Sequence, residues 1–332
     1  MKNLSKLQAI RSNHSDLSYI RDRADIFRKE LFSYDKGLLA ETDVILNFED
    51  FGNAPDGRFT ISHKNVDFDC FYKRNKESDR LYVFFSGARA QSDPNPIFKR
   101  VSYYNFMSGS MLNIDDPMCR IYPKLGLGWY YGTKDESYCE LVSEIVEEFA
   151  KRNGIQNRNI IFFSSSGGGT AALHCACKIK ESMAVTINPQ IKLSLYDYYK
   201  TFQDITSIDL DAEDKFDRNN LPYLISKAED SRFLIIQNIE SSVDMLQLDH
   251  LCSVIGTDYH YGLTRLKPNI LSWTFQVKAE NPHNTNEYPA MVLAMEYLID
   301  NFDKAEELEY LCLLLSELWY DRCQLAKLVP KE

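Results

Sequence analysis

The chain has 332 residues, of which 44% are hydrophobic, 13% aromatic and 26% charged, and its formal net charge is −10. This is a globular composition, with enough length to bury a substantial core. The acidic balance, with no basic run beyond Phe98-Lys99-Arg100, argues against nucleic acid as a partner, because phosphate binding needs a concentrated positive surface.

The sequence also indicates a cellular location. No apolar run approaches the roughly 20 residues of a membrane-spanning helix. The first residues lack the apolar stretch and the cleavage site of a signal peptide. We therefore expect a cytoplasmic protein with no transmembrane segment.

Residues 1–75 are expected to form an N-terminal extension of helix and edge strands. Apolar positions from Leu17 to Phe27 recur at helical spacing, which predicts a helix near the start of the chain. Short alternating stretches at 59–61 and 68–71 predict antiparallel strands at the edge of a sheet.

Residues 76–304 show buried strands that alternate with helices. Continuous apolar runs, as expected for strands covered on both faces, lie at 81–85, 111–114, 160–163, 184–187, 233–236 and 273–277. One helix is predicted from Thr133, which has Glu136 at capping-box spacing, to Gly154, and another from 286 to 301. The alternation predicts an α/β fold with a mainly parallel central sheet and helices on both faces.

Two segments stand outside this alternation. The long polar stretch 191–230 is expected to be an insertion that caps the carboxyl ends of the strands. Residues 305–332 have the pattern of an amphipathic C-terminal helix, which packs on the body or binds a partner.

The strongest chemical signal is a run of three serines and three glycines, from Ser164 to Gly169, between a buried strand and a helix rich in small residues. A nucleophile elbow needs small residues two before and two after the nucleophile, because the turn is strained and crowded by backbone. Ser164 and Gly168 occupy these places around Ser166. The N–H groups of the following helix then face the oxyanion that forms during acyl transfer.

Other glycine-rich turns match this segment less well. A phosphate-binding P-loop ends in Gly-Lys-Ser/Thr, and no lysine is present here. A dinucleotide fingerprint needs G-x-G-x-x-G, which Gly167-Gly168-Gly169-Thr170 does not supply. A turn without chemistry stays open as an alternative, and serine rather than glycine at 164 makes the elbow a variant.

A second oxyanion donor is expected from the loop after an earlier strand. The strand 81–85 runs into Ser86-Gly87-Ala88-Arg89, and Gly87 allows the backbone to approach the site closely. The N–H of Ala88 or Gly87 would then join the N–H of Gly167. The alternative is an ordinary glycine at the end of a strand.

In folds with a nucleophile elbow, the nucleophile comes first along the chain, then the acid and then the histidine. This order selects the base. Five of the six histidines do not fit, because they precede the serine, lie on the helix after it, or come before the last strand: His14, His63, His174, His250 and His260. His283 directly follows the last strand, on a loop able to reach the serine hydroxyl.

Two carboxylates qualify as the acid after the strand 233–236. Asp244 is favoured because aspartate is the commoner choice and a longer loop is allowed, whereas Glu240 lies nearer the usual offset. Whichever one serves would hold the imidazole tautomer and stabilise the imidazolium.

The cysteines and histidines give no clear metal site. Eight cysteines are scattered without a CxxC pair, as is usual in a reducing compartment. The cluster His174-Cys175-Ala176-Cys177 has ligand types, but adjacent positions face different sides of a helix and no second ligand group follows at zinc spacing. We interpret it as small buried helix residues and expect no metal and no permanently bound cofactor.

Five short motifs occur in a fixed order between about residues 80 and 300: Phe84-Phe85-Ser86-Gly87-Ala88-Arg89, Ile114-Asp115-Asp116-Pro117, Gly128-Trp129-Tyr130-Tyr131-Gly132, the Ser166 turn and Asn188-Pro189-Gln190. Together they resemble bacterial capsular-polysaccharide biosynthesis proteins of the α/β-hydrolase fold, which are similar to the sugar O-acetyltransferases of capsule loci and accessory secretion systems. The resemblance implies a serine acetyl-enzyme, acetyl-CoA as co-substrate and a glycan hydroxyl as acceptor.

The resemblance also assigns residues. It implies Ser166 as nucleophile, His283 as base, and Gly87 with Gly167 around the oxyanion. The loop after Gln237-Asn238 departs from the family pattern, which leaves Asp244 and Glu240 both open as the acid.

Three further residues draw attention through the resemblance. Arg89 would bind a phosphate of CoA or of a phosphate-bearing glycan. Trp129 would stack on a sugar or adenine face, and Gln190 would hydrogen-bond the triad or the acceptor. The alternatives are a surface arginine, a core tryptophan and a loop glutamine.

The sequence therefore predicts an O-acetyltransferase that acts on a bacterial surface polysaccharide, capsule-like, or on its precursor. Capsule-assembly proteins are the expected partners, and such a complex would hold the protein at the inner membrane. Two alternatives stay open: a carbohydrate esterase or deacetylase with the same triad, and a non-catalytic glycan- or protein-binding scaffold.

Overall fold

The computed structural model describes residues 35–105, 107–212, 214–284 and 289–304, and the structural statements that follow concern these residues. The strands are β1 (Ile45–Leu46), β2 (Gly57–His63), β3 (Val66–Lys73), β4 (Leu81–Phe85), β5 (Ser110–Ile114), β6 (Ile160–Ser165), β7 (Met183–Ile187), β8 (Arg232–Asn238), β9 (Gly262–Lys267) and β10 (Ile270–Phe275). The α-helices are α3 (Met118–Ile121), α4 (Tyr138–Arg152), α5 (Ser166–Lys178), α6 (Tyr199–Thr206), α7 (Leu221–Lys227), α8 (Ser242–Ile255) and α9 (Pro289–Asp300).

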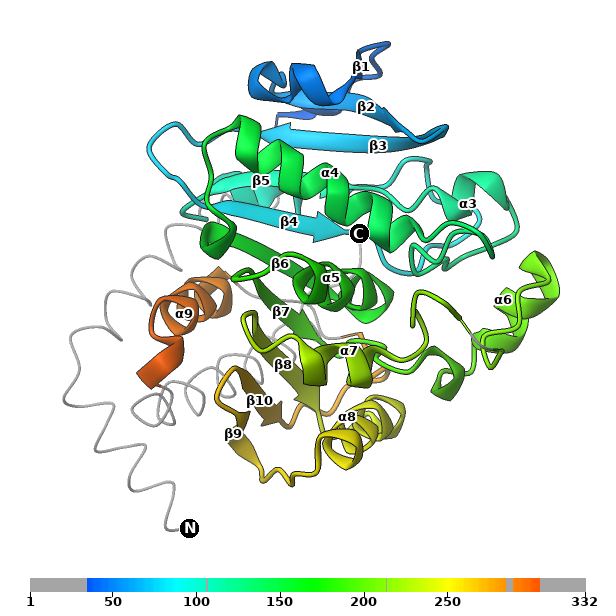
Figure 1. Cartoon of the computed structure of the whole chain (residues 1–332), viewed down its shortest axis with the longest axis vertical. Helices are drawn as coiled ribbons and strands as arrows, with labels where there is room; N and C mark the ends of the chain where they lie inside the picture. The colour runs from blue at the N-terminus through cyan, green and yellow to red at the C-terminus, as the bar shows by residue number, and fades with distance from the viewer. Residues whose placement is uncertain (1–34, 106, 213, 285–288, 305–332) are drawn as a thin grey trace.

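All ten strands form one sheet in the order β1-β2-β3-β5-β4-β6-β7-β8-β10-β9 (Figure 1). The run from β5 to β10 in this order is parallel throughout, which confirms the predicted mainly parallel sheet. β2 and β3 are antiparallel to each other, as expected, and β3 pairs antiparallel with β5. Strands β1 and β9 were not predicted, because they are edge strands without a continuous apolar run.

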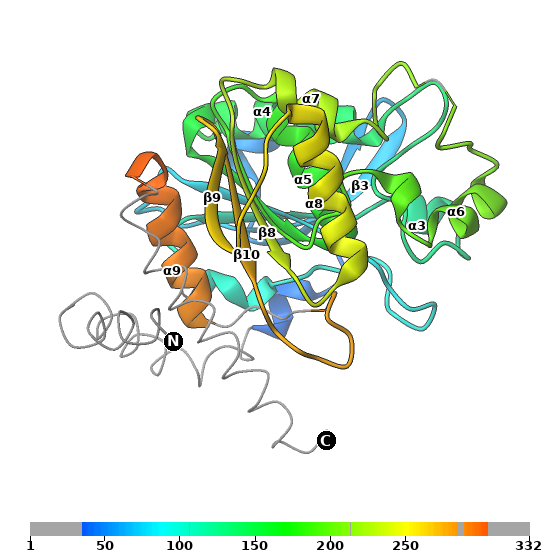
Figure 2. The ribbon, with the colours of Figure 1, turned by 90° about the horizontal axis from the view of Figure 1, so that it is seen from below.

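The sheet separates two apolar cores, because successive side chains of a strand point to opposite faces. In β4, Leu81, Val83 and Phe85 belong to one core, and Tyr82 and Phe84 belong to the other. Helices α4, α5, α7 and α8 cover the first face and α9 covers the second (Figure 2). This two-sided burial explains the unbroken apolar runs of the central strands and confirms helices on both faces.

Helix α4 begins later than its capping-box pattern predicted. Its N-cap is Ser137, whose Oγ accepts the N–H of Glu140 at 3.3 Å. Thr133 Oγ1 instead accepts the N–H groups of Asp135 and Glu136 in the preceding turn, at 3.2 and 3.1 Å. The predicted start at Thr133 was therefore wrong, because two possible caps lie four residues apart and the chain uses the second.

The segment 191–230 divides into two parts. Helix α7 packs against α5 and α8, with Leu221 and Ile225 in the main core. Residues 196–198 and Thr201 instead line a cavity at the candidate site, and α6 lies beyond the arrowheads of the strands in Figure 1. The part around residues 196–206 thus lies at the carboxyl end of the sheet, whereas α7 belongs to the layer of helices on the first face.

Some predicted elements fall outside the described residues, namely the helices expected within 1–34 and 305–332. The helix predicted over 286–301 corresponds to α9, which is described from Pro289 to Asp300. Across the described parts of the chain, no helix combines the length and apolarity needed to cross a membrane.

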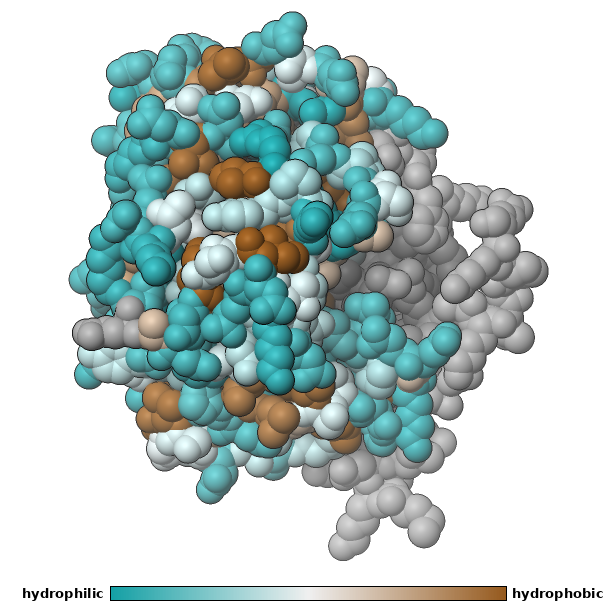
Figure 3. Space-filling view, turned by 90° about the vertical axis from the view of Figure 1, so that its right-hand side faces the viewer, coloured by the Kyte–Doolittle hydropathy of each residue, from teal (hydrophilic) through white to brown (hydrophobic). Residues whose placement is uncertain are grey.

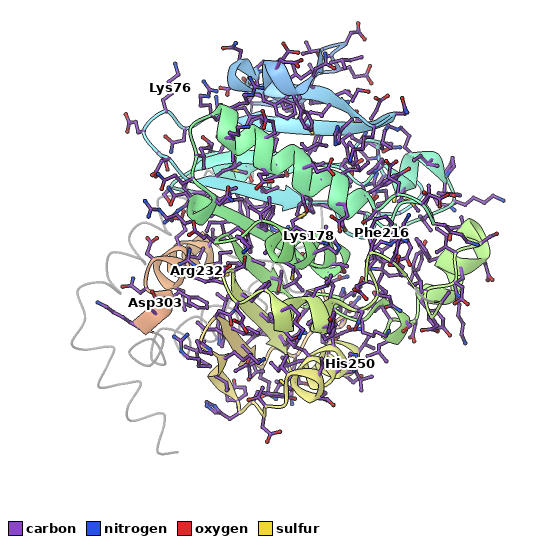
Figure 4. All side chains as sticks on the ribbon, in the orientation of Figure 1. Lys76, Lys178, Phe216, Arg232, His250 and Asp303 are labelled. Atoms are coloured by element: carbon purple, nitrogen blue, oxygen red, sulfur yellow. The ribbon has the colours of Figure 1, made fainter. Side chains whose placement is uncertain are left out.

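A buried histidine makes the stability of this fold depend on pH. Burial of His174 on α5, together with the smaller effect of the Lys178 charge (Figure 4), lowers the pKa of His174 to about 3. The folded state therefore binds the proton more weakly than the unfolded state, so stability is full above pH ~6.5 and is lost as pH falls from there towards pH ~3. Between about pH 7 and pH 5 this loss is about 2 kcal/mol.

We predict that His174→Leu decreases the pH dependence of the unfolding free energy by that amount. Urea unfolding of both proteins at the two pH values measures it. The same pH dependence in the variant would contradict a neutral, buried His174.

Candidate active site

Ser166 lies where β6 passes into α5, and its backbone is left-handed, with φ of 52°. A non-glycine residue in this conformation stores about 1–3 kcal/mol of strain, which the surrounding structure must hold. Ser164 Oγ donates to the carbonyl of Phe85 at 3.0 Å, and a Cβ on Gly168 would lie 2.5 Å from Ser164 Oγ. Small residues on both sides of Ser166 are therefore required by close packing.

The three serines of this turn have different partners. Ser164 bonds the backbone of β4, and Ser165 Oγ accepts a hydrogen bond from Arg100 Nη2 at 2.8 Å. Ser166 Oγ lies 2.7 Å from His283 Nε2. Of the three hydroxyls, that of Ser166 is the one directed at a histidine.

His283 joins Ser166 to a buried carboxylate. Its Nδ1 lies 2.8 and 2.9 Å from the two carboxylate oxygens of Asp244, whose side chain is fully buried. Asp244 is in the first turn of α8, where the helix dipole favours a negative charge. The chain Ser166–His283–Asp244 thus has the order and the distances of a serine nucleophile, its general base and the carboxylate that orients the base.

Glu240, the alternative acid, lies elsewhere. Its carboxylate contacts Gln276 Nε2, and its side chain lines the neighbouring cavity. The structure therefore brings Asp244, rather than Glu240, to the imidazole.

Two asparagines that the sequence analysis did not select hold the His283 loop. Asn188 Nδ2 donates to the carbonyl of His283 at 2.9 Å, and its Oδ1 accepts the N–H of Asn238 at 2.8 Å. Asn238 Nδ2 donates to the carbonyls of Val277 and Pro282, at 2.8 and 3.0 Å. Asn238 is the last residue of β8 and Asn188 directly follows β7, so a polar residue at the carboxyl end of a buried strand was the available signal.

The predicted oxyanion loop lies against the elbow. A Cβ on Gly87 would lie 3.8 Å from the backbone nitrogen of Gly168 and 3.9 Å from that of Gly167. Gly167 is in the first turn of α5, where a backbone N–H has no acceptor in the preceding turn. Ala88 lines the cavity beside His283. The loop after β4 is therefore in close contact with the first turn of α5, as the predicted oxyanion hole requires.

Arg89 also lines the cavity, but its charge has a partner within the protein. Its guanidinium forms an ion pair with Asp115, and both side chains are almost fully buried. It also donates to Ser86 Oγ at 3.2 Å and to Asn95 Oδ1 at 3.1 Å. Arg89 thus connects the predicted oxyanion loop to the Asp115 loop. Because Asp115 already neutralises its charge, Arg89 differs from an arginine that is available to bind a phosphate.

Trp129 and Gln190 form a second pair of contacts with the elbow. Trp129 is 1% exposed, its ring packs on Tyr198 and Phe202, and its indole N–H donates to Gln190 Oε1. Gln190 is fully buried, and its Nε2 lies 3.3 Å from Ser166 Oγ. The structure therefore brings Gln190 to Ser166 and buries Trp129 behind it, away from a ligand surface.

A cavity of about 630 Å³ opens beside His283. Tyr196, whose ring centroid lies 5.7 Å from that of His283, lines it with Tyr198, and Asp197, Thr201 and Glu240 add polar groups. Figure 3 shows the side of the molecule at the carboxyl ends of the parallel strands, where the surface is mainly hydrophilic with separate apolar patches.

Metal-ligand residues are not clustered in the part of the chain that the structure describes, where no group of three or more His, Cys, Asp or Glu side chains could hold an ion. His174 and Cys175 are buried on α5, in agreement with the sequence interpretation of this cluster.

The strand order, with β5 and β4 exchanged relative to the chain and the serine turn after β6, defines the α/β-hydrolase fold. No protein-family model matches the sequence, and no curated protein matches it.

Solved structures of this fold are similar to the chain at low sequence identity. The capsule O-acetyltransferase of Neisseria meningitidis serogroup A is 16% identical with a TM-score of 0.52, and the match covers 75% of this chain and 97% of that one. The Glycosylation Associate Protein (Gap123) complex from Streptococcus agalactiae is 15% identical with a TM-score of 0.51, over 75% of this chain and 46% of that one. Puromycin hydrolase is 12% identical with a TM-score of 0.51, over 76% and 39%.

We predict that Gly87→Ala and Gly168→Ala fail in different ways. A methyl group on Gly87 meets only ordinary contacts but would lie 3.9 Å from the backbone nitrogen of Gly167, so turnover of p-nitrophenyl acetate should fall about 10-fold or more with little change in melting temperature. A methyl group on Gly168 would lie 2.5 Å from Ser164 Oγ and 2.8 Å from the carbonyl of Phe85, so that variant should lose stability. Full activity of a folded Gly87→Ala protein would contradict the oxyanion assignment.

We further predict that Asp244→Asn lowers turnover about 10²- to 10⁴-fold, because the carboxylate no longer fixes the imidazole tautomer. Glu240→Gln keeps the side-chain shape at the cavity wall and serves as the matched control, with an expected change of less than about 3-fold. Equal losses in the two variants would remove Asp244 from the triad.

Proposed function

We propose that this protein is a serine-dependent acyltransferase, and that it moves an acetyl group from acetyl-CoA to a hydroxyl group of a bacterial surface polysaccharide or its precursor. The observation that carries the proposal is the Ser166–His283–Asp244 chain next to a cavity lined by tyrosines and polar side chains. A scaffold without chemistry would not require a strained serine aligned on a histidine with a fully buried carboxylate behind it.

The first half-reaction acylates Ser166. His283 Nε2 takes the hydroxyl proton while Oγ attacks the thioester carbonyl, and the N–H groups of Gly167 and of Gly87 or Ala88 stabilise the oxyanion. The tetrahedral intermediate collapses, the carbon–sulfur bond breaks, and His283 returns the proton to the departing CoA thiolate. Asp244 stabilises the imidazolium in between.

The second half-reaction transfers the acetyl group. His283 removes the proton of an acceptor hydroxyl, the acceptor oxygen attacks the acetyl carbonyl, and the bond from carbon to Ser166 Oγ breaks. His283 then returns the proton to Ser166. An acceptor that occupies the cavity reacts in preference to water because it is held in the attacking position.

The chemistry of the cavity supports a sugar as acceptor. The rings of Tyr196 and Tyr198 offer stacking surfaces beside His283, and Asp197 and Thr201 offer hydrogen-bond partners for hydroxyl groups. The sequence resemblance to capsule and accessory-secretion O-acetyltransferases, together with the similar fold of the meningococcal capsule O-acetyltransferase, supports acetyl-CoA and a glycan as the two substrates.

We place the protein in the cytoplasm, in contact with polysaccharide-assembly proteins. Its free cysteines in the described residues, Cys70, Cys119, Cys139, Cys175, Cys177 and Cys252, support a reducing compartment.

The test is incubation with acetyl-CoA followed by intact-mass analysis. The wild-type protein should gain one acetyl group and release CoA, and Ser166→Ala, which changes one atom at the nucleophile, should gain none. An equal adduct on Ser166→Ala would contradict the assignment of the nucleophile.

The acceptor is tested in the same experiment. Addition of a capsule-type oligosaccharide should discharge the adduct faster than buffer does and should acetylate the sugar. Discharge at the same rate with and without sugar, with acetate as the product, would identify a hydrolase.

A further inference from the structure

Gln190 lies beside the nucleophile without belonging to the triad. Its Nε2 is 3.3 Å from Ser166 Oγ, and its Oε1 accepts the indole N–H of Trp129. Both side chains are shielded from solvent, with exposures of 0% and 1%. The Gln190 amide is thus shielded from solvent, and the Trp129 indole holds its carbonyl oxygen.

Chemistry determines the direction of each hydrogen bond in this group. An indole N–H only donates, so the carbonyl oxygen of Gln190 must face Trp129, and the amide NH₂ must face Ser166. Since Ser166 Oγ accepts this N–H, its own proton is free to point to His283 Nε2.

The direction of the hydrogen bond between His283 and Asp244 is determined in the same way. An ionised carboxylate only accepts, so Asp244 requires the proton of His283 on Nδ1 and leaves Nε2 as an acceptor. The Trp129 indole, which only donates, and the Asp244 carboxylate, which only accepts, thus determine the direction of every hydrogen bond between them.

We propose that Gln190 is a further catalytic residue, whose amide N–H donates to Ser166 Oγ, and that Trp129 positions this amide. The proposal rests on the acyl-transfer function of Ser166 and adds a donor that acts on a different atom from the oxyanion hole. The oxyanion hole stabilises the carbonyl oxygen, whereas Gln190 stabilises Oγ as negative charge develops on it, when Oγ leaves the acetyl group in the second half-reaction.

The backbone around Gln190 holds it against the elbow. Its N–H donates to the carbonyl of Ser166 at 3.4 Å, and Thr170 Oγ1 donates to its carbonyl at 2.7 Å. Gln190 is therefore attached to the first turns of α5 at two points besides its side chain.

Trp129 is held by a loop that another motif anchors. Trp129 and Tyr130 both have a left-handed backbone, with φ of 54°, which needs external support. Asp116 supplies it, since its carboxylate accepts the N–H groups of Tyr130 and Met118, each at 3.0 Å. The Tyr130 hydroxyl accepts the N–H of Ser86 at 2.9 Å, so the same loop also supports the oxyanion strand end.

The test compares Gln190→Met with Gln190→Glu in p-nitrophenyl acetate turnover, with acylation and deacylation separated by stopped flow. Methionine fills the space without donating, so deacylation should fall about 10- to 100-fold, and the ratio of variant to wild-type rate should not change with pH. Comparison with wild type at each pH cancels the pH dependence that the two proteins share.

Gln190→Glu gives a signature that a merely structural role would not give. The carboxylate accepts from Ser166 and draws its proton away from His283, but the protonated carboxyl donates to Oγ as the amide does. Its rate relative to wild type should therefore rise as pH is lowered. A pH-independent ratio for Gln190→Glu, together with wild-type deacylation in Gln190→Met, would overturn the proposal.

Trp129→Phe, alone and combined with Gln190→Met, completes a double-mutant cycle. It removes the indole donor but keeps an aromatic ring, so we expect a loss of about 3- to 10-fold in the wild-type background and no further loss in Gln190→Met. Additive losses would contradict the positioning role of Trp129.

A measurement without turnover separates this proposal from the proposed function. The indole N–H resonance of Trp129, assigned with Trp129→Phe, should shift in Gln190→Met as its hydrogen bond is lost. If the wild-type protein takes up no acyl group, the proposed function fails. Independently of that result, an unchanged Trp129 resonance in Gln190→Met would overturn the proposed hydrogen bond between Trp129 and Gln190.

Discussion

The left-handed backbone of Ser166 is the constraint on which the site depends. A φ of 52° at a residue with a side chain is unfavourable, and the packing of Ser164 and Gly168 against the end of β4 holds it in place. This conformation turns the chain sharply from β6 into α5, with Ser166 Oγ within hydrogen-bond distance of His283. It also places the Gly167 N–H next to Gly87.

The parallel sheet supplies the remaining groups. Strands β4, β6, β7, β8 and β10 all end on the same side, so the loops that follow them meet around Ser166. Asn188 and Asn238 connect the ends of β7 and β8 to the His283 loop, and Asp244 follows in the first turn of α8. Residues far apart in the chain thus meet within hydrogen-bond distance.

Much of this arrangement could be predicted from the sequence. Buried parallel strands have unbroken apolar runs, so the central sheet was recognisable, and the small residues around Ser166 marked the turn. Chain order selected His283 from six histidines. These features are local or depend only on order along the chain.

Other features depend on contacts that sequence alone does not fix. The choice of Asp244 over Glu240 depends on how the loop after β8 enters α8. Arg89 has the sequence context of a ligand-binding residue, yet Asp115 neutralises it from another loop. Trp129 and Gln190 are 61 residues apart, and neither residue on its own indicates the hydrogen bond between them.

Buried hydrogen bonds connect the short, separate motifs to the serine turn. Asp116 holds the loop of Trp129 and Tyr130, Tyr130 holds Ser86, and Trp129 orients Gln190. Each motif therefore acts on Ser166 through a small number of buried hydrogen bonds, in a site whose groups must be aligned before the substrate arrives.

The most direct test of the central claim is covalent labelling with a fluorophosphonate, which reacts with an activated serine, followed by peptide mapping. The account predicts one adduct, on Ser166 and on neither Ser164 nor Ser165, and loss of that adduct in His283→Ala. Labelling of a different serine, or undiminished labelling of Ser166 without His283, would contradict it.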